Sequence, residues 1–231
     1  MKAWNKGLTK EINESVKKIS ETMKQRKLDN FKQWRDKAKR EGSMKNQYLR
    51  FKKNGDLAEL IGAILGDGNI YRFERTEGLR IVGNSKHIGF VRRYTKLVEK
   101  VIGKKSHVAK RKNSYGTNIT LYEKHLSTRL GIPTGSKKEI KWMIPKWVLS
   151  NEEYVCRYLR GLYETDGSTS VHLETYTHKF MFSNKNESLL CIVFNLMQRL
   201  GFHPHRSKYM IQISRKEEVQ KAKNLLQFRR Y

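Results

Sequence analysis

An apolar segment of nine residues occurs twice in the chain, and both copies end in Asp-Gly. The first copy, LIGAILGDG, spans residues 60–68, and the second, LRGLYETDG, spans residues 159–167. Asp67 and Asp166 are 99 residues apart, as are the glycines that follow them. Apolar residues recur at helical spacing within each copy, and glycine is the usual residue just past a helix. The repeat therefore restricts the fold to two similar halves, each containing a helix that ends at an aspartate.

The elements expected after each copy also repeat. Each half is predicted to contain a helix, a hairpin, a second helix, a second hairpin and a last helix, which gives an α+β fold of two lobes about a pseudo-twofold axis. The first lobe has helices at 57–65, 87–102 and 124–130, and strands at 69–74, 79–84, 106–112 and 117–122. The second lobe has helices at 153–165, 187–200 and 216–226, and strands at 168–176, 179–183, 203–207 and 209–214.

Four segments follow from this plan: a basic arm (1–55), the first lobe (56–131), a connector (132–152) with clustered Lys137, Lys138 and Lys141, and the second lobe (153–231). Residues 1–56 carry 17 Lys and Arg against 7 Asp and Glu. Their sparse apolar residues repeat at helical spacing and predict one or two short helices, with Thr9 or Asn13 as the N-cap. A disordered, solubilising tail is the alternative.

The charge of the whole chain points to a polyanionic partner. Lys and Arg number 49 against 22 Asp and Glu, which gives a net charge of +27. Such an excess destabilises a compact protein by self-repulsion, and nucleic acid is the favoured partner. A membrane surface is disfavoured, because no basic segment also carries a broad apolar face. No run approaches 18 apolar residues and no signal peptide is evident, so a soluble, intracellular protein of unassigned compartment is expected. Cys156 and Cys191 are interpreted as core residues.

Small residues four apart in each copy predict that the two motif helices cross closely. Side chains at this spacing share one helix face, and their small size lets two backbones approach. If the helices lie side by side, Asp67 and Asp166 converge at the negative ends of both helix dipoles. Carboxylates at such a point suit Mg²⁺, which can support phosphodiester hydrolysis. The residues expected in the helix interface are Gly62, Gly66, Gly161 and Thr165.

These two motifs resemble those of single-chain, intron-encoded LAGLIDADG homing endonucleases. The resemblance covers about residues 56–226, including the connector sequence KWMIPKW. It implies two αββαββα lobes whose antiparallel sheets form a saddle on DNA. It also implies metal-dependent cleavage of both strands across the minor groove, leaving short 3′ overhangs. Mg²⁺ is the expected ion, with Mn²⁺ as the alternative, and the implied ligands are Asp67, Asp166 and the carbonyls of Gly66 and Thr165. Leu65 and Glu164 occupy a variable motif position that faces away from the metal.

Basic or amide residues are expected beside each aspartate. Lys86 and Lys185 each follow their motif aspartate by 19 residues, and Asn84 and Asn184 lie next to them. We interpret the lysines as stabilisers of the transition state and the asparagines as organisers of water. The alternative for each lysine is a solvated cap or a phosphate anchor.

Alternation along the strands predicts which residues contact DNA. In the second lobe Val171, Leu173, Tyr209, Ile211 and Ile213 are expected to point inward, whereas Ser170 and Met210 point outward. His203 and His205 are interpreted as surface or DNA-facing residues, because a third metal ligand is missing. The predicted DNA contacts are Arg72, Arg80, Lys110, Lys112, His172, Glu174, Tyr176, Lys208 and Gln212.

The arm and the function leave alternatives open. WNKGLTKE followed by NESVKKISETMKQRK resembles the small modular DNA-binding motif found beside several homing nucleases, which would lengthen the contact with DNA. The expected partner is double-stranded DNA with a long specific target, bound by a monomer. An RNA-binding maturase acting on intron RNA and a non-cleaving DNA-binding protein are the alternatives. Both aspartates are present, which favours the nuclease.

Overall fold

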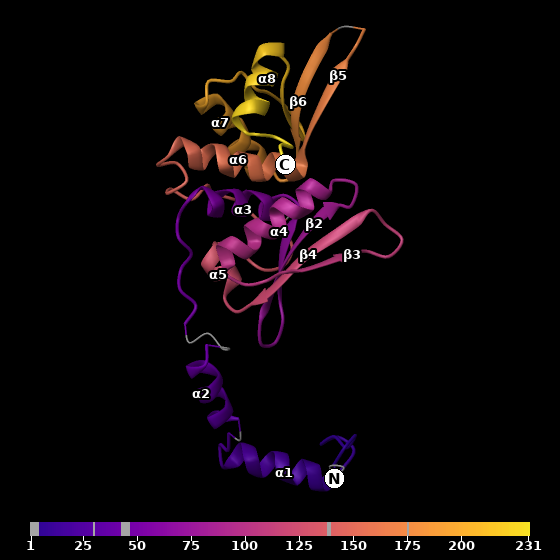
Figure 1. The fold of residues 1–231 in the computed structure, drawn as a ribbon, viewed down its shortest axis with the longest axis vertical. Helices are drawn as coiled ribbons and strands as arrows, with labels where there is room; N and C mark the ends of the chain where they lie inside the picture. Colours follow the sequence, from indigo (N-terminus) through magenta and orange to yellow (C-terminus); the bar gives the residue numbers. More distant parts are fainter. Residues whose placement is uncertain (1–4, 30, 43–46, 138–139, 175) are drawn as a thin grey trace. The chain divides into compact units, whose positions relative to one another are not determined.

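The computed structural model describes residues 5–29, 31–42, 47–137, 140–174 and 176–231, and it divides into two units, Met1–Tyr48 and Leu49–Tyr231 (Figure 1). The first unit contains helices α1 (Glu14–Gln25) and α2 (Lys32–Arg40). The side chain of Asn13 caps α1 by accepting a hydrogen bond from the backbone N–H of Val16 (3.1 Å). The two short helices expected in the arm are therefore present, whereas Trp4 of the modular motif lies outside the described residues.

The second unit consists of two lobes with the same order of elements. The first lobe contains α3 (Gly55–Leu65), β1 (Gly68–Arg72), β2 (Glu77–Asn84), α4 (Ile88–Ile102), β3 (His107–Lys110), β4 (Gly116–Glu123) and α5 (Leu126–Leu130). The second contains α6 (Glu152–Asp166), β5 (Gly167–His172), β6 (Thr177–Ser183), α7 (Glu187–Arg199), β7 (His205–Ser207), β8 (Met210–Ile213) and α8 (Lys216–Leu225). The antiparallel sheets have the orders β1-β2-β4-β3 and β5-β6-β8-β7. The predicted αββαββα plan is confirmed in both lobes.

Each sheet has one face covered by helices and one face free of them, which we call the open face. In the first sheet Leu79 and Ile81 of β2 are buried against the helices, whereas Arg80 and Val82 are partly exposed. In the second sheet Phe180 and Phe182 of β6 are buried against the helices in the same way. The period of two in a strand produces this division, because alternate side chains point to opposite faces.

Three of the predicted inward-facing residues are exposed. Val171, Leu173 and Tyr209 are 52%, 77% and 50% exposed, so the expectation that they would be buried is wrong. Val171 has the register of the helix-facing residues, but it lines an open cleft beside Val219 of α8 and therefore stays half exposed. Leu173 and Tyr209 lie in hairpin turns, where alternation no longer applies. Ile211 and Ile213 are fully buried, as predicted.

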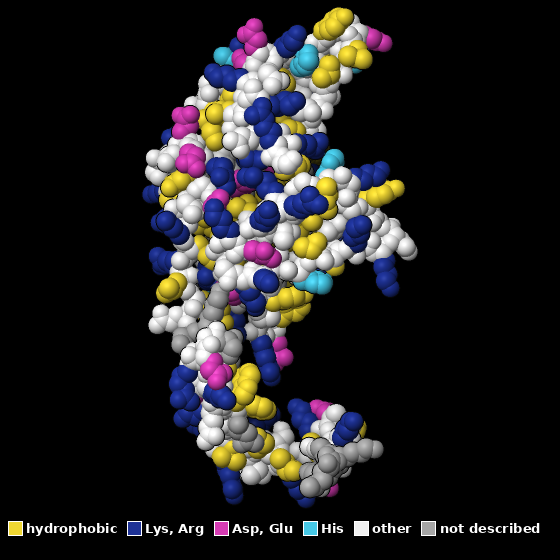
Figure 2. Space-filling model, in the orientation of Figure 1, with side chains coloured by type: hydrophobic (Ala, Val, Ile, Leu, Met, Phe, Trp, Pro, Cys, Tyr) yellow, Lys and Arg dark blue, Asp and Glu magenta, His cyan; other side chains and the backbone are white. Residues whose placement is uncertain are grey.

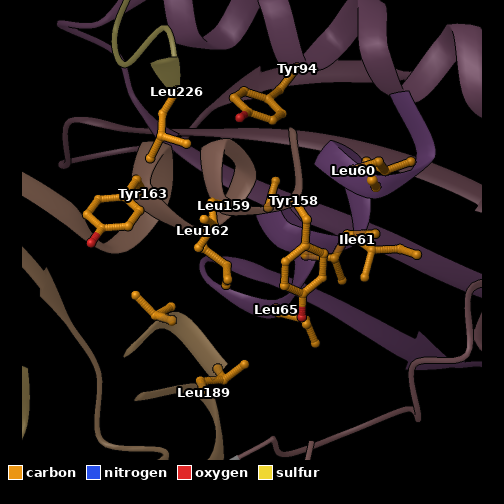
Figure 3. Close-up of a cluster of buried hydrophobic side chains, with 14 of the residues drawn as sticks. Leu60, Ile61, Leu65, Tyr94, Tyr158, Leu159, Leu162, Tyr163, Leu189 and Leu226 are labelled. Atoms are coloured by element: carbon orange, nitrogen blue, oxygen red, sulfur yellow. The ribbon is translucent and has the colours of Figure 1, made fainter. Parts of the chain in front are cut away.

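The two lobes meet where α3 and α6 cross, as the small residues of the motifs predict. A Cβ atom added to Gly62 would overlap the backbone of α6 at Tyr158, and one added to Gly161 would overlap the backbone of α3 at Glu59. Leucines and tyrosines of both helices surround the crossing and form one continuous core with Leu189 and Leu226 (Figure 3). Close backbone approach is thus required here, and only glycine permits it.

A buried group of charged residues lies beside this crossing. Glu59 of α3 is completely buried and accepts two hydrogen bonds from Arg93, both of 2.8 Å. Arg157 of α6 also pairs with Glu59, at 2.5 Å. Charges taken out of water in this way must be paired, and the loss of one partner is costly. The pairs therefore tie α3 and α4 of the first lobe to α6 of the second.

Glu164 of the second motif is buried as well. It accepts hydrogen bonds from the backbone N–H of Arg229 (2.6 Å) and the hydroxyl of Tyr231 (3.1 Å). This acid therefore anchors the segment after α8. Within the described ranges, no helix has the length and apolar character needed to cross a membrane.

Candidate active site

Asp67 and Asp166 lie together where α3 and α6 end. Asp67 follows Gly66, the C-cap of α3, and Asp166 is the last residue of α6. The backbones are so close that a Cβ built on Gly66 would lie 3.3 Å from Asp166 Oδ2 and would overlap the side chain of Thr165. The structure thus brings together the two carboxylates, with Gly66 and Thr165 between them.

Both carboxylates have a raised affinity for protons. Loss of hydration and the negative charge of Asp166 raise the pKa of Asp67 to about 6, although the ammonium of Lys137 opposes the shift. Partial burial also raises the pKa of Asp166, while a hydrogen bond from Asn184 and the charge of Lys137 lower it. Like charges in a partly desolvated site produce such shifts, and an added cation would reverse them.

Asn184 contacts one of the two motif aspartates. Its Nδ2 donates a hydrogen bond to Asp166 Oδ2 (2.7 Å), and its Oδ1 accepts one from the backbone N–H of Asn186 (2.8 Å). Asn84 has the matching backbone contact, because its Oδ1 accepts from the N–H of Lys86 (2.9 Å). The side chain of Asn84 is exposed, however, so the two half-sites are not equivalent.

Lys137 is the site residue that the sequence did not assign. Its Nζ donates to the carbonyl oxygens of Ile64 (2.6 Å), Leu65 (2.8 Å) and Gly66 (2.7 Å). The last carbonyls of a helix have no partner within it and carry partial negative charge, so an ammonium is well matched to them. Burial lowers the pKa of Lys137 to about 8, although both aspartates act to raise it. The clustered lysines of the connector were the available signal, but Lys138 lies outside the described residues.

The connector is held in place from the second lobe. Asn186, the N-cap of α7, is buried and donates to the carbonyl oxygens of Lys137 (3.1 Å) and Ile140 (2.9 Å). Ser188 accepts from the backbone N–H of Trp142 (2.8 Å). Lys137 therefore has its backbone fixed to the second lobe while its ammonium contacts the end of α3 in the first.

The donor set at the site fits a hard divalent cation. No cluster of three or more His, Cys, Asp and Glu side chains occurs among the described residues, so two carboxylates are the acidic ligands offered. Carboxylate and carbonyl oxygens suit Mg²⁺, which usually keeps several waters and binds through one or two carboxylates plus substrate phosphate. The carbonyl of Gly66, predicted as a metal ligand, already faces a cation, because it accepts from Lys137.

Lys86 and Lys185 are exposed and lie two residues before the helices that follow the first hairpins. The ammonium of Lys86 lies 4.3 Å from the centre of the Tyr115 ring. Lys185 lines a cleft with Trp142 and Cys191. Of the four cations and amides predicted at the site, Asn184 is thus the one with a hydrogen bond to a motif aspartate among the described residues.

The predicted DNA contacts fall into three groups. Arg80, His172 and Gln212 have the register of the open faces, and the guanidinium of Arg80 lies 4.5 Å from the centre of the Tyr71 ring. Arg72 and Lys110 lie at strand ends, opposite the buried residues Glu77 and Thr117 in the strand register. Their side chains therefore leave the backbone on the helix-covered face of the sheet. The remaining four lie in hairpin turns: Lys112, Glu174, Tyr176 and Lys208.

Comparisons with known proteins agree with this architecture. Residues 153–230 match the family model described as LAGLIDADG-like domain. No curated protein matches the chain in sequence. Among solved structures, I-DmoI in complex with DNA and Mn is 19% identical, with a TM-score of 0.52 over 74% of this chain and 96% of that one.

The same fold occurs in a protein with a different name. The N-terminal LAGLIDADG domain of DUF199/WhiA is 14% identical, with a TM-score of 0.53 over 79% of this chain and 88% of that one. Full-length DUF199/WhiA from Thermatoga maritima is also 14% identical, with a TM-score of 0.52 over 76% and 56%. Identities this low carry information on the fold alone. The second lobe therefore matches a LAGLIDADG-like domain in sequence, and the two αββαββα lobes together have the fold of I-DmoI.

Proposed function

We propose that the protein is a site-specific endonuclease of the homing type, which cuts both strands of DNA across the minor groove with a divalent metal and leaves short 3′ overhangs. The observation that carries the proposal is the meeting of Asp67, Asp166 and Lys137 where the motif helices end. Two adjacent carboxylates with raised pKa values are poised to take up cations. I-DmoI, which shares the fold, has been solved with DNA and Mn.

The residues of the site divide the work of phosphodiester hydrolysis. Asp67 and Asp166 would hold Mg²⁺, with Mn²⁺ as the alternative, together with the carbonyls of Gly66 and Thr165. Bound metal would supply activated water and neutralise charge on the leaving oxygen. Asn184 fixes the orientation of Asp166 through its 2.7 Å hydrogen bond. Lys137 places a positive charge beside both carboxylates, where it would stabilise the extra negative charge of the transition state.

The open faces are the surfaces that we propose for DNA. Arg80, His172 and Gln212 would reach base edges, and Lys112 and Lys208 in the turns would contact phosphates. Lys86 and Lys185 remain proposed partners of the scissile phosphates, and Asn84 a proposed organiser of water. One chain holds both motifs, so we expect a monomer; a stable dimer by light scattering would contradict this.

Cleavage of a matched pair of substrates tests the proposal. The insert-less allele of the host gene and a plasmid library of randomised targets are each incubated with wild-type protein, Asp67→Asn and Asp166→Asn in Mg²⁺. We expect double-strand cleavage by the wild type alone, and none after replacement of Mg²⁺ with EDTA. If the wild type cuts no better than Asp67→Asn, the protein is not this kind of enzyme.

Two alternative functions on the same scaffold predict different binding and cleavage results. A maturase would bind folded intron RNA more tightly than duplex DNA of equal length. A non-cleaving DNA-binding protein would retain affinity for DNA but leave it intact at all metal concentrations. The presence of both motif aspartates favours the nuclease over the latter.

A further inference from the structure

A cleft of about 760 Å³ lies on the helix-covered side of the first lobe. Volumes of this order are typical of sites for small ligands. It lies between α4, the start of α3 and the first half of α6, and Tyr231 closes one side. The cations that line it are Lys86, Arg92, Arg93, Lys96, Lys100 and Arg157.

Positive charge in this cleft exceeds what the protein itself neutralises. Among the described residues that line it, Asp56 is the one with an acidic side chain, and it already pairs with Lys100 (2.6 Å) and Arg157 (2.5 Å). Arg92 and Lys96 are exposed, and neither forms an ion pair within the described part of the chain. They are four apart on α4, a spacing at which like charges repel and destabilise a helix. An anion between them would relieve that repulsion.

Part of the cleft is rigid. Arg93 and Arg157 are both held by the buried carboxylate of Glu59, at 2.8 and 2.5 Å. The position of their guanidinium groups is therefore fixed before any ligand arrives, which reduces the entropy lost on binding. Lys and Arg side chains gather over α4 in the space-filling view (Figure 2).

Apart from Lys86, the cleft is separate from the surface proposed for target DNA. The opposite side of α4 buries Val91, Tyr94 and Val98 against the sheet, so the cleft and the open face of that sheet lie on opposite sides of the lobe. A duplex on the open face could not fill the cleft at the same point.

We propose that this cleft binds the phosphate groups of a nucleotide or an oligonucleotide, as a second anion site outside the DNA-binding saddle. Arg92 and Lys96 supply the free charges, and Arg93 and Arg157 supply planar donors that suit phosphate oxygens. The site needs neither the motif aspartates nor a divalent metal, so the proposal can be tested independently of the nuclease activity.

The test uses the full chain in EDTA, with tripolyphosphate as the probe and amide ¹H–¹⁵N shifts as the readout. We expect the largest shifts at residues 86–100 and at Arg157. The variant Arg92→Gln/Lys96→Gln should weaken binding about tenfold, the loss expected for one net charged hydrogen bond. The matched control Lys105→Gln/Lys124→Gln removes two exposed charges of the same lobe outside the cleft and should change binding less than about twofold.

A thymidine octanucleotide separates the two sources of phosphate. If the octanucleotide shifts the same amides and tripolyphosphate displaces the octanucleotide, terminal and internal phosphates share the site. If the octanucleotide binds and tripolyphosphate does not, the site is one for spaced phosphodiesters. In either case, the slope of the logarithm of the octanucleotide binding constant against the logarithm of salt concentration should be smaller by about 1.4 in Arg92→Gln/Lys96→Gln. Equal weakening by both double variants, or shifts spread evenly over the surface, would overturn the proposal.

Discussion

The two motif aspartates have different neighbours, although the sequence presents them as equivalents. Asp166 receives a hydrogen bond from Asn184, whereas Asp67 lies beside carbonyls that bind the ammonium of Lys137. Asp67 follows its helix, but Asp166 is still part of its own. The half-sites of the proposed nuclease are therefore chemically unequal, and the two DNA strands should be cut at different rates.

Replacement of Lys137 by methionine should lower the cleavage rate by about 100-fold or more, as the loss of one preorganised electrostatic contact does in other enzymes. The pKa of Asp67 should also rise further, because Lys137 acts to lower it. Single-turnover cleavage and a pH profile of the rate measure the two effects. Lys141→Met, a change at an exposed connector lysine, is the control. An unchanged profile in Lys137→Met would contradict the assigned role.

Asp67 should make the metal-free protein less stable as the pH rises. Its pKa of about 6 in the folded state lies above the ordinary value of 3.8, so the folded state binds more protons between these values. Stability therefore falls from about pH 4 to pH 6, and the full penalty persists above that. Since the side chain reaches solvent, we expect Asp67→Asn to gain about 1 kcal/mol at pH 7.5 and nothing at pH 3.

Substitution of Asp56 is the control, because its expected effect on stability at pH 7.5 is opposite to that of Asp67→Asn. Burial raises its pKa, but hydrogen bonds from Lys100 and Arg157 outweigh this effect and lower it. Its ionised form therefore stabilises the fold above the unfolded pKa, and Asp56→Asn should lose stability at pH 7.5. Urea unfolding of both variants in EDTA at the two pH values is the measurement. A loss of stability in both variants at pH 7.5 would show that the negative charge of Asp67 does not destabilise the metal-free fold.

At the scale of elements, the crossing of α3 and α6 depends on the absence of side chains. Gly62→Ala should destabilise the protein by about 3 kcal/mol, because the new methyl group would overlap backbone of α6 that cannot move aside. Gly55→Ala, in the same helix, would meet side-chain atoms of Glu153 and Arg157 but no backbone atom of α6. Thermal unfolding of the two variants compares them directly, and equal stability would mean that the helices are not tightly crossed.

The helices and strands could be predicted from the sequence because their signals are local. Apolar spacing and terminal glycines located α3 and α4, for example, to within two residues of the observed ends. Exposure of Val171 could not be predicted, since alternation does not reveal whether a helix packs closely against that part of a strand. Lys137 was missed as well, because it lies in an aperiodic segment and only the folded chain brings it to the end of α3.

At the scale of the whole molecule, the basic unit Met1–Tyr48 should add affinity for DNA without affecting the chemistry. Residues 1–48 carry 14 Lys and Arg against 6 Asp and Glu. Their deletion should weaken duplex binding and reduce its dependence on salt, because fewer counterions are released. Fluorescence anisotropy at several salt concentrations measures both effects. A change in the cut position after deletion would contradict the proposed division of labour.

The two-lobe scaffold alone does not determine activity. A DNA-bound structure of I-DmoI and the LAGLIDADG domain of DUF199/WhiA resemble this chain to a similar degree, with TM-scores of 0.52 and 0.53. Function belongs to sites on a fold rather than to the fold itself. The decisive evidence for this chain is therefore the set of groups around Asp67 and Asp166.

Lys137 also has a mechanical consequence. Its carbonyl is bonded to Asn186 of the second lobe, and its ammonium is bonded to three carbonyls of the first. Any hinge motion between the lobes must lengthen one set of these bonds. A ligand that bends the molecule would therefore shift the cation relative to the aspartates. In the proposed nuclease, the shape of the bound DNA and the electrostatic potential at the aspartates would thus be coupled through one side chain.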